Sequence, residues 1–438
     1  MIGSGISGLS AAWLLDRAAD ITIYEAEHRI GGHAHTVSVA HEGGERSVDI
    51  GFIVYNEATY PNLTALFDYI GVATKTTNMS LAISIDDGRL EYAGGYLHQL
   101  FAQKRNVLRP RFWSMLRDLV RFYDQAPRDL MRLASADMTL GAYLRENNYG
   151  AAFRDDHLLP MAAAIWSAPV GKVLDFPAHA FIRFQENHGL LKVKGRPLWR
   201  TVEGGSREYV AKLLDGFGGR IRTAAGVQRI ERQAGGVVVH AADGSDEIYD
   251  QVVVATHADQ ALAMLAHPTR REQEILGAFR YTVNEAILHS DQQLMPKRAR
   301  AWASWNYLGN SSEADQLTVT YWMNLLQGLP ADPPLFVTLN AKQQPAAGAV
   351  HWRQRFEHPQ MDQRAGKAQQ ALWSLQGEDR IWYCGAYFGA GFHEDGLQAG
   401  LAVAEAIADV RRPWQVPNES GRIVLGADRR TATGSVVA

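Results

Sequence analysis

Met1-Ile-Gly-Ser-Gly-Ile-Ser-Gly-Leu-Ser-Ala-Ala-Trp-Leu-Leu15 opens the chain and decides its fold. Three glycines have the spacing G-x-G-x-x-G, and apolar residues recur after them at helical intervals. The first glycine of this pattern allows a tight turn, the second lets a pyrophosphate approach the backbone, and the third permits close packing of helix and sheet. The N-terminus of the helix offers free N–H groups to the phosphates. The expected dinucleotide contacts are Gly3, Ser4, Gly5, Ile6, Ser7 and Gly8.

An acidic residue follows at the position where a ribose would lie. Ile21-Thr-Ile-Tyr-Glu25 predicts a short buried strand ending in an acid, and the Glu25 carboxylate can accept both ribose hydroxyls, with Ala26 next to it. A second diglycine, Gly31-Gly32, indicates FAD over NAD, because a second backbone turn has to cover the longer dinucleotide beside its pyrophosphate. His33 and His35 are too few for a metal site, so we expect them to pack near the cofactor and expect no metal.

The strand that should lead into the first glycine loop is nearly absent, since only Met1 and Ile2 precede Gly3. In a parallel sheet this strand is central, and its loss would expose a hydrogen-bonding ladder on both sides. We therefore expect the natural start to lie a few residues upstream.

Composition and charge exclude several classes of protein. The 438 residues carry 44 Lys+Arg against 47 Asp+Glu, a balance that argues against a nucleic-acid binder. The single cysteine, Cys384, excludes an intrachain disulfide and a cysteine-rich metal site, and it fits a reducing compartment. No apolar run reaches the roughly 18 residues of a membrane-spanning helix. We expect a cytoplasmic protein.

The remaining pieces of a dinucleotide domain are spread along the chain, with two long inserts between them. A diglycine at Gly204-Gly205 opens an amphipathic helix, a buried strand runs from Val252, and another enters a glycine-rich turn at Gly385. We predict an α/β fold in which a discontinuous, Rossmann-like FAD-binding domain is interleaved with a mixed α+β substrate domain. The FAD-binding domain comprises residues 1–72, 195–266 and 378–413. The substrate domain comprises residues 73–194 and 267–377, and residues 414–438 are expected to form a loosely ordered tail.

These glycines, the acid at Glu25 and the terminal helix resemble those of FAD-dependent oxidoreductases of the amine oxidase and phytoene desaturase superfamily, over nearly the whole chain. A closer resemblance is to bacterial proteins known as predicted NAD/FAD-binding proteins, which accompany cyclopropane-fatty-acyl-phospholipid synthases. It rests on phrases such as Asp49-Ile-Gly-Phe-Ile-Val-Tyr-Asn, Met161-Ala-Ala-Ala-Ile-Trp-Ser and Gly391-Phe-His-Glu-Asp-Gly-Leu. The resemblance implies a small-molecule or acyl-lipid substrate and a partner of the cyclopropane-fatty-acid-synthase kind.

The resemblance also implies how FAD would be held. The pyrophosphate would lie on Gly3 to Gly8 and Gly31-Gly32, the ribose on Glu25, and the adenine against the backbone of Val227. The turn from Gly385 and the helix start at Gly396 and Leu397 would approach the isoalloxazine. Some relatives attach the flavin to a cysteine, but a buried cysteine such as Cys384 more often behaves as a small hydrophobe, so we expect non-covalent FAD.

One departure from the family pattern concerns amine oxidation. Many amine oxidases place a lysine near flavin N5 on a strand of the substrate domain. The best match here, Arg280-Tyr-Thr-Val-Asn-Glu-Ala-Ile-Leu-His, has Asn284 or Glu285 at that place. This difference argues against plain amine oxidation.

Three side chains are candidates for catalysis, because a base is needed if a proton leaves with the hydride that the flavin takes. His393 and Glu394 either reach the flavin ring as a titratable pair or belong to a capping loop whose acids complement a helix N-terminus. His188, on a glycine-bounded turn, either faces the cavity or is structural.

Residues 101–132 form a basic segment, with two interpretations left open. A basic amphipathic helix there would lie on anionic phospholipid, whereas an ordinary surface helix would pack its apolar stripe on the core. Pro127 interrupts the segment. Its eight basic residues are Lys104, Arg105, Arg109, Arg111, Arg117, Arg121, Arg128 and Arg132.

The sequence therefore predicts an FAD-dependent oxidoreductase that removes a hydride from a carbon of an acyl lipid, either in the cytoplasm or at the inner membrane face. Two alternatives remain at this point. One is an amine oxidase that uses oxygen, and the other is a flavin-binding accessory protein of a lipid-modifying enzyme.

Overall fold

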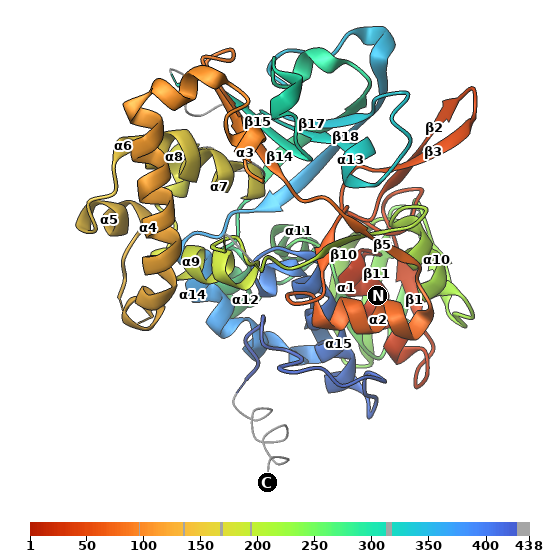
Figure 1. Ribbon diagram of the computed structural model, residues 1–438. Coiled ribbons are helices and arrows are strands. Elements are labelled where there is room, and N and C mark those ends of the chain that lie inside the picture. Colours follow the sequence, from red (N-terminus) through yellow and green to blue (C-terminus); the bar gives the residue numbers. More distant parts are fainter. Residues whose placement is uncertain (96, 135, 167–169, 193–194, 312–317, 427–438) are drawn as a thin grey trace.

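A parallel sheet forms the centre of the first domain of the computed structural model, which describes residues 1–95, 97–134, 136–166, 170–192, 195–311 and 318–426 (Figure 1). β1 (Thr22–Tyr24) pairs with β9 (Arg220–Arg222), and β13 (Val252–Val254) pairs with β19 (Ile381–Tyr383). Both pairs are parallel. β13 and β19 consist of apolar residues, as central strands covered on two faces should, whereas β9 carries two arginines and is largely exposed.

The N-terminal residues join these two pairs into one sheet. Ile2 forms parallel bridges to Tyr24 on one side and Val254 on the other. Its N–H donates to Val253 O at 2.9 Å, and the Gly3 N–H donates to Tyr24 O at 2.8 Å. The expectation of a central ladder exposed on both sides was therefore wrong, because Met1 to Gly3 make its hydrogen bonds.

Two helices cover this sheet at very short range. α1 (Ile6–Leu15) follows the glycine loop, and α15 (His393–Ile407) lies against it. A Cβ on Gly400 would lie 2.2 Å from Ser7 O, and one on Gly396 would lie 2.7 Å from Ser7 Oγ. Only glycine at these two positions allows the helices to approach so closely. α2 (Pro61–Ile70) and α10 (Arg207–Leu214) pack beside them.

Smaller sheets surround this core. β10 (Val227–Gln233), β11 (Gly236–Ala241) and β12 (Asp246–Tyr249) form an antiparallel layer. The other short elements of this half are β2 (Thr36–His41), β3 (Gly44–Asp49), β4 (Tyr55–Asn56), β5 (Thr74–Thr77), β8 (Trp199–Val202), α11 (Ala258–Met264), α12 (Arg270–Leu276) and α14 (Gln363–Leu372).

A seven-stranded sheet defines the second domain, in the upper part of Figure 1. Its order is β18–β14–β17–β16–β15–β6–β7, and every pair is antiparallel except β15 with β6. The strands are β18 (Val350–Pro359), β14 (Tyr281–His289), β17 (Phe336–Leu339), β16 (Thr318–Trp322), β15 (Trp305–Gly309), β6 (Leu81–Ile85) and β7 (Leu90–Ala93). A mixed sheet shared by two distant chain segments agrees with the predicted interleaving.

Helices flank one side of this sheet (Figure 1). The longest, α4 (Pro110–Leu133), continues through Pro127 and buries Phe112, Met115 and Phe122. Its apolar stripe thus packs on the core, as the second interpretation of this segment requires. The others on this side are α5 (Leu140–Glu146), α6 (Ala151–Phe153), a π-helical turn (Arg154–Leu158), α7 (Leu159–Trp166), α8 (Val170–Val173) and α9 (Ala178–Asn187). Two short helices, α3 (Leu97–Leu100) and α13 (Met323–Leu326), complete this half of the molecule. No helix in the described part of the chain is long and apolar enough to cross a membrane.

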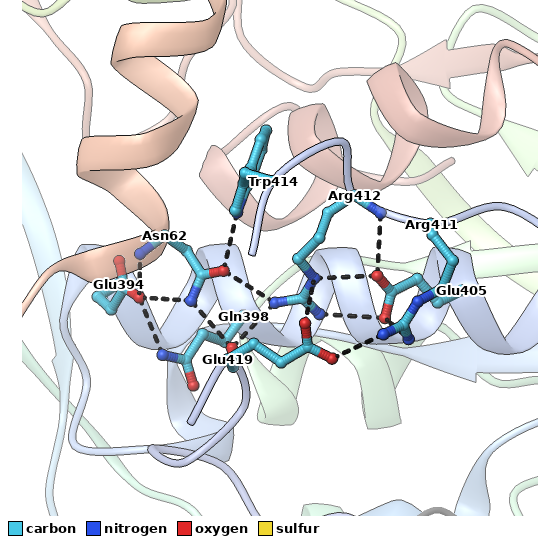
Figure 2. A network of polar contacts seen from close by, with 8 residues as sticks. All are labelled: Asn62, Glu394, Gln398, Glu405, Arg411, Arg412, Trp414 and Glu419. Atoms are coloured by element: carbon cyan, nitrogen blue, oxygen red, sulfur yellow. Dashed lines mark hydrogen bonds and ion pairs between the residues drawn. The ribbon is translucent and has the colours of Figure 1, made fainter. Parts of the chain in front are cut away.

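The segment after α15 packs closely on the first domain. Trp414 stacks on Trp13 with ring centroids 5.9 Å apart, and Arg422 Nε donates to Asp395 Oδ1 at 2.5 Å. Figure 2 shows Arg412 bound to Glu405 and Asn62 in the same region. Residues 414–426 are therefore ordered by specific contacts and were wrongly predicted as a loose tail, whereas residues 427–438 lie outside the described residues.

Candidate active site

One continuous cavity of about 1110 Å³ lies between the two domains. The glycine loop, Glu25 and the turn at Gly385 line it from the first domain. Strands β6, β14 and β18 and helix α7 line it from the second. A site built from both domains can hold a dinucleotide and a second molecule at once.

The glycine loop leaves open space where a phosphate would lie. A Cβ added to Gly5 would meet no atom within 4 Å. The second glycine turn lies on another side of Gly5, where a Cβ added to Gly32 would come within 2.9 Å of Gly5 Cα. Gly3 has φ +96°, which only glycine adopts without strain. The backbone of two turns and the N-terminus of α1 therefore surround a cradle that matches the shape and charge of a pyrophosphate.

Glu25 is held in place at the edge of this cradle. Its Oε2 accepts hydrogen bonds from the Ser4 N–H at 3.0 Å and from Ser4 Oγ at 2.5 Å, and its Oε1 accepts from the Glu27 N–H at 2.9 Å. The carboxylate lines the cavity, together with Ala26 and Val227. Its orientation is thus fixed before any ribose hydroxyl arrives.

The other cofactor residues predicted from the sequence fall into two groups. Those that line the cavity are Gly3, Ser4, Gly5, Ile6, Ser7, Glu25, Ala26, Gly32, His33, Val227 and Gly385. Gly8, Gly31, Gly396 and Leu397 lie outside the lining. Gly8 and Gly396 serve helix packing, because a Cβ on Gly8 would lie 2.0 Å from Gly3 O.

His393 lines the cavity at the start of α15. Its ring stacks on Phe52 with centroids 3.9 Å apart, and its Nε2 lies 2.6 Å from the Tyr209 hydroxyl. Burial lowers the pKa of His393 to about 3. The imidazole is therefore neutral at pH 7 and can exchange hydrogen bonds without carrying charge.

Glu394 has a different position from its neighbour. Its Oε1 accepts from the Asn62 N–H at 3.0 Å and from Asn62 Nδ2 at 2.9 Å (Figure 2). Its Oε2 accepts from the Leu63 N–H at 2.9 Å. Gln398 Nε2 is a further donor at 2.9 Å. The carboxylate is fully buried and caps the N-terminus of α2, outside the cavity lining. The expected contact of Glu394 with the flavin ring is thus corrected. The capping that was expected at the start of its own helix, α15, is made by Asp395, whose Oδ2 accepts from the Phe392 N–H at 2.7 Å.

His188 is buried and lines the cavity. Its Nδ1 donates to Phe184 O at 2.9 Å, and its ring stacks on Phe184 at 3.9 Å. Its Nε2 has no hydrogen-bond partner among the described residues. Burial lowers the pKa of His188 to about 3, so a neutral imidazole presents an acceptor nitrogen beside Tyr60 and Phe392.

Three further histidines line the cavity that were not predicted from the sequence. His257 follows β13, with its Nδ1 3.2 Å from Glu357 Oε2. His358 is on β18, and its Nδ1 accepts a hydrogen bond from Asn284 Nδ2 at 2.8 Å. His157 is on the π-helical turn. No local pattern predicts this convergence, because the three residues come from elements far apart in the chain. Among the described residues no group of side chains could hold a metal ion.

Comparison with known proteins identifies the family. Residues 6–323 match the model of the family described as flavin containing amine oxidoreductase. The chain belongs to this family. It is accordingly an FAD-dependent oxidoreductase, and the cradle at Gly5 and the Glu25 carboxylate fit FAD. A comparison with curated proteins finds no match.

Solved structures of other flavin amine oxidoreductase-like folds cover almost the whole chain. Putrescine oxidase bound to putrescine aligns with a TM-score of 0.65 at 14% identity, over 93% of this chain and 97% of that chain. Cyclohexylamine oxidase from Brevibacterium oxydans IH-35A gives 0.64 at 16%, over 93% and 98%. A CLA-producing fatty acid isomerase from P. acnes gives 0.63 at 16%, over 93% and 96%. At such identities these likenesses show the fold alone, and they agree with the predicted amine-oxidase-like architecture.

In this member of the family, the cysteine and the residue at the expected lysine position have structural roles. Cys384 is fully buried, outside the cavity lining, and burial raises the pKa of its thiol to about 12. Such a thiol is a poor nucleophile, which favours non-covalent FAD. Asn284 is buried in β14, where it binds His358. FAD supplies the hydride acceptor, and the chain's residues bind it, exclude water and orient the second molecule.

Proposed function

We propose that this flavoprotein removes a hydride from a carbon of an acyl chain, as a dehydrogenase or desaturase of a fatty acid or phospholipid. The apolar wall of the cavity in the second domain carries this proposal. Beyond the cofactor cradle the lining consists mainly of aliphatic and aromatic side chains, among them Leu81, Ile83, Met161, Ile165 and Leu339. A carbon chain gains about 0.8 kcal/mol for each methylene that such a wall removes from water.

Amine oxidation is the second candidate, because two of the similar folds are oxidases of putrescine and cyclohexylamine. Its substrate would need a partner for an ammonium group. Glu357 lines the cavity in the second domain, but its Oε2 already lies 3.2 Å from His257 Nδ1. Asn284 in place of lysine also removes a group that amine oxidases of this kind commonly carry. These features favour the acyl substrate.

Anaerobic mixing decides between the two. We expect the visible flavin absorption of the holoprotein to bleach with fatty acids or with phospholipids carrying unsaturated or cyclopropane-bearing chains. Putrescine and cyclohexylamine should leave it unchanged. Bleaching by the amines alone would replace the proposal by amine oxidation. A yellow protein that no compound reduces would support the accessory role beside a cyclopropane-fatty-acid-synthase-type partner.

We further propose that the tip formed by α3, residues 101–109 and the start of α4 rests on an anionic membrane surface. Its exposed apolar side chains include Leu108, 85% exposed, and Trp113, whose Nε1 donates to Val107 O at 2.8 Å. Lys104, Arg105 and Arg109 lie among them. Arg111 pairs with Asp156 and, farther along α4, Arg128 pairs with Asp124. Among the described residues Lys104, Arg105 and Arg109 form no ion pair, so positive charge without an acidic partner gathers at the tip.

Replacing Leu108 by glutamate should weaken binding to phosphatidylglycerol-containing vesicles roughly tenfold or more, because it loses the burial of a leucine and adds a repelled charge. Co-sedimentation with the vesicles measures this. Met131→Glu is the matched control, since Met131 is 89% exposed at the other end of α4. Equal loss in both variants, or no binding by the unchanged protein, would contradict the proposed surface.

A further inference from the structure

A cluster of polar side chains interrupts the apolar wall of the cavity. Tyr92 from β7, Tyr123 from α4, His157 from the π-helical turn and Arg196 all line the same cavity. Tyr92 and His157 are in direct contact, with the Tyr92 hydroxyl 3.0 Å from His157 Nδ1. Polar groups in a mostly apolar pocket commonly fix the orientation of a ligand.

His157 has an incomplete set of hydrogen bonds. It is only 8% exposed, and its Nε2 has no partner among the described residues. Buried polar atoms in native proteins are almost always paired, so a lone one in a cavity wall points to a ligand. The π-helical turn that carries it agrees with this, since such turns concentrate at functional sites.

The Tyr92 hydroxyl lets this imidazole act as a donor. Its single proton goes either to Asp156 O, at 2.8 Å, or to His157 Nδ1, at 3.0 Å. In the second arrangement the proton of the neutral imidazole is on Nε2, which then donates to an acceptor in the cavity. Burial, and to a smaller extent the positive charge of Arg196, lowers the pKa of His157 to about 4. The imidazole therefore stays neutral and offers a single donor.

Arg196 supplies the charge of this cluster. Its guanidinium forms no ion pair among the described residues, its Nε donates to Lys192 O at 2.6 Å, and the side chain is exposed at the edge of the cavity. Tyr123 and His157 line the same cavity as Arg196, whose positive charge contributes to the shifted pKa of each of them. A cation with two neutral donors suits an oxyanion with one negative charge.

We propose that Tyr123, His157 and Arg196 bind the anionic head group of the acyl substrate, while its chain lies along the apolar wall. The inference rests on the proposed function and deepens it, because it selects acyl compounds with a negatively charged oxygen head over neutral ones. A fatty-acid carboxylate and a phospholipid phosphodiester share this chemistry. These three residues are positioning residues, and no proton or electron passes through them.

The test compares ligands with one chain and different heads on the holoprotein. Oleate should bind at least about tenfold more tightly than oleyl alcohol or methyl oleate, as followed by the change in the flavin spectrum or by tryptophan quenching. A second comparison tests the phosphodiester: the affinity for phosphatidylglycerol is measured against that for a diacylglycerol with the same chains. The comparison that shows the preference identifies the source of the oxyanion.

Arg196→Gln should abolish the preference for the charged head, so that oleate binds no more tightly than oleyl alcohol does to the same variant. Arg355→Gln is the matched control, because Arg355 also lines the cavity but belongs to β18, away from the cluster. Loss of the preference in Arg355→Gln alone would overturn the assignment. His157→Gln, which keeps a donor, should retain most of the preference, whereas His157→Leu should lose it.

Failure of this inference is distinguishable from failure of the proposed function. If the acid, alcohol and ester bind equally and bleach the flavin equally, no head-group site exists, yet the acyl substrate stands. If no acyl compound binds or reduces the flavin, the proposed function fails, and the inference fails with it.

Discussion

Replacing Gly5 by valine is expected to abolish FAD binding while the apoprotein keeps its fold. A Cβ at this position would meet no protein atom within 4 Å, and Gly5 has φ −68°, which any residue adopts. The added side chain would therefore fill the cradle between the two glycine turns, where the pyrophosphate has to lie. We expect the affinity for FAD to fall roughly a hundredfold or more, since overpacking a close-fitting site costs about 1–3 kcal/mol or displaces the ligand altogether.

The ratio of flavin to protein absorbance after purification, and a titration of the apoprotein with FAD, measure this loss. Gly366→Ala is the matched control. Gly366 lies in α14, and a Cβ there also meets nothing within 4 Å, but the site is remote from the glycine loop. That variant should purify with full FAD and be slightly more stable, by about 0.5–1 kcal/mol. A yellow Gly5→Val protein with unchanged affinity would show that the pyrophosphate lies elsewhere.

Replacing Arg412 by leucine is expected to destabilise the protein by about 3–5 kcal/mol, because it removes the buried partner of the Glu405 carboxylate and leaves only the exposed Arg411 to pair with it. Arg412 and Glu405 have side chains only 1% and 2% exposed. Arg412 Nε donates to Glu405 Oε1 at 2.9 Å and Nη1 donates to Asn62 Oδ1 at 2.9 Å (Figure 2). Asn62 in turn binds Glu394, so the loss would also loosen the start of α15 beside His393.

Denaturant unfolding followed by tryptophan fluorescence measures the difference. Arg411→Leu provides a close comparison, since Arg411 bridges the same Glu405 at 3.2 Å but is 58% exposed. An exposed ion pair contributes at most about 1 kcal/mol, so this variant should lie near the unchanged protein. Similar losses in the two variants would contradict the importance given to burial.

Much of the cofactor cradle could be predicted from the sequence, because its signals are local. Each of these signals lies within a few consecutive residues: the glycine spacing Gly3, Gly5 and Gly8, the acid Glu25, and the second diglycine. The chemistry of a single turn or strand end explains each of them without knowledge of the rest of the fold. The interleaved domain order also followed, since buried strands and glycine turns mark their own positions. The predicted α/β fold therefore agrees with the structure.

The substrate side of the site could not be predicted in the same way. Glu394 caps a helix whose residues Asn62 and Leu63 lie more than three hundred positions earlier in the chain. His157 reaches the cavity through an irregular turn, and Arg196 through a connection between domains. Such placements depend on tertiary packing, and no periodicity or spacing in the sequence predicts them.

The packing of α1 against α15 has a consequence for how the protein is made. During synthesis the glycine loop leaves the ribosome well before α15 and the turn at Gly385, which complete the same cavity. Domains fold as units during synthesis only when all their parts are present. The complete FAD site thus forms only after α15 has been synthesised, and until then the growing chain lacks the stabilisation that its own cofactor provides.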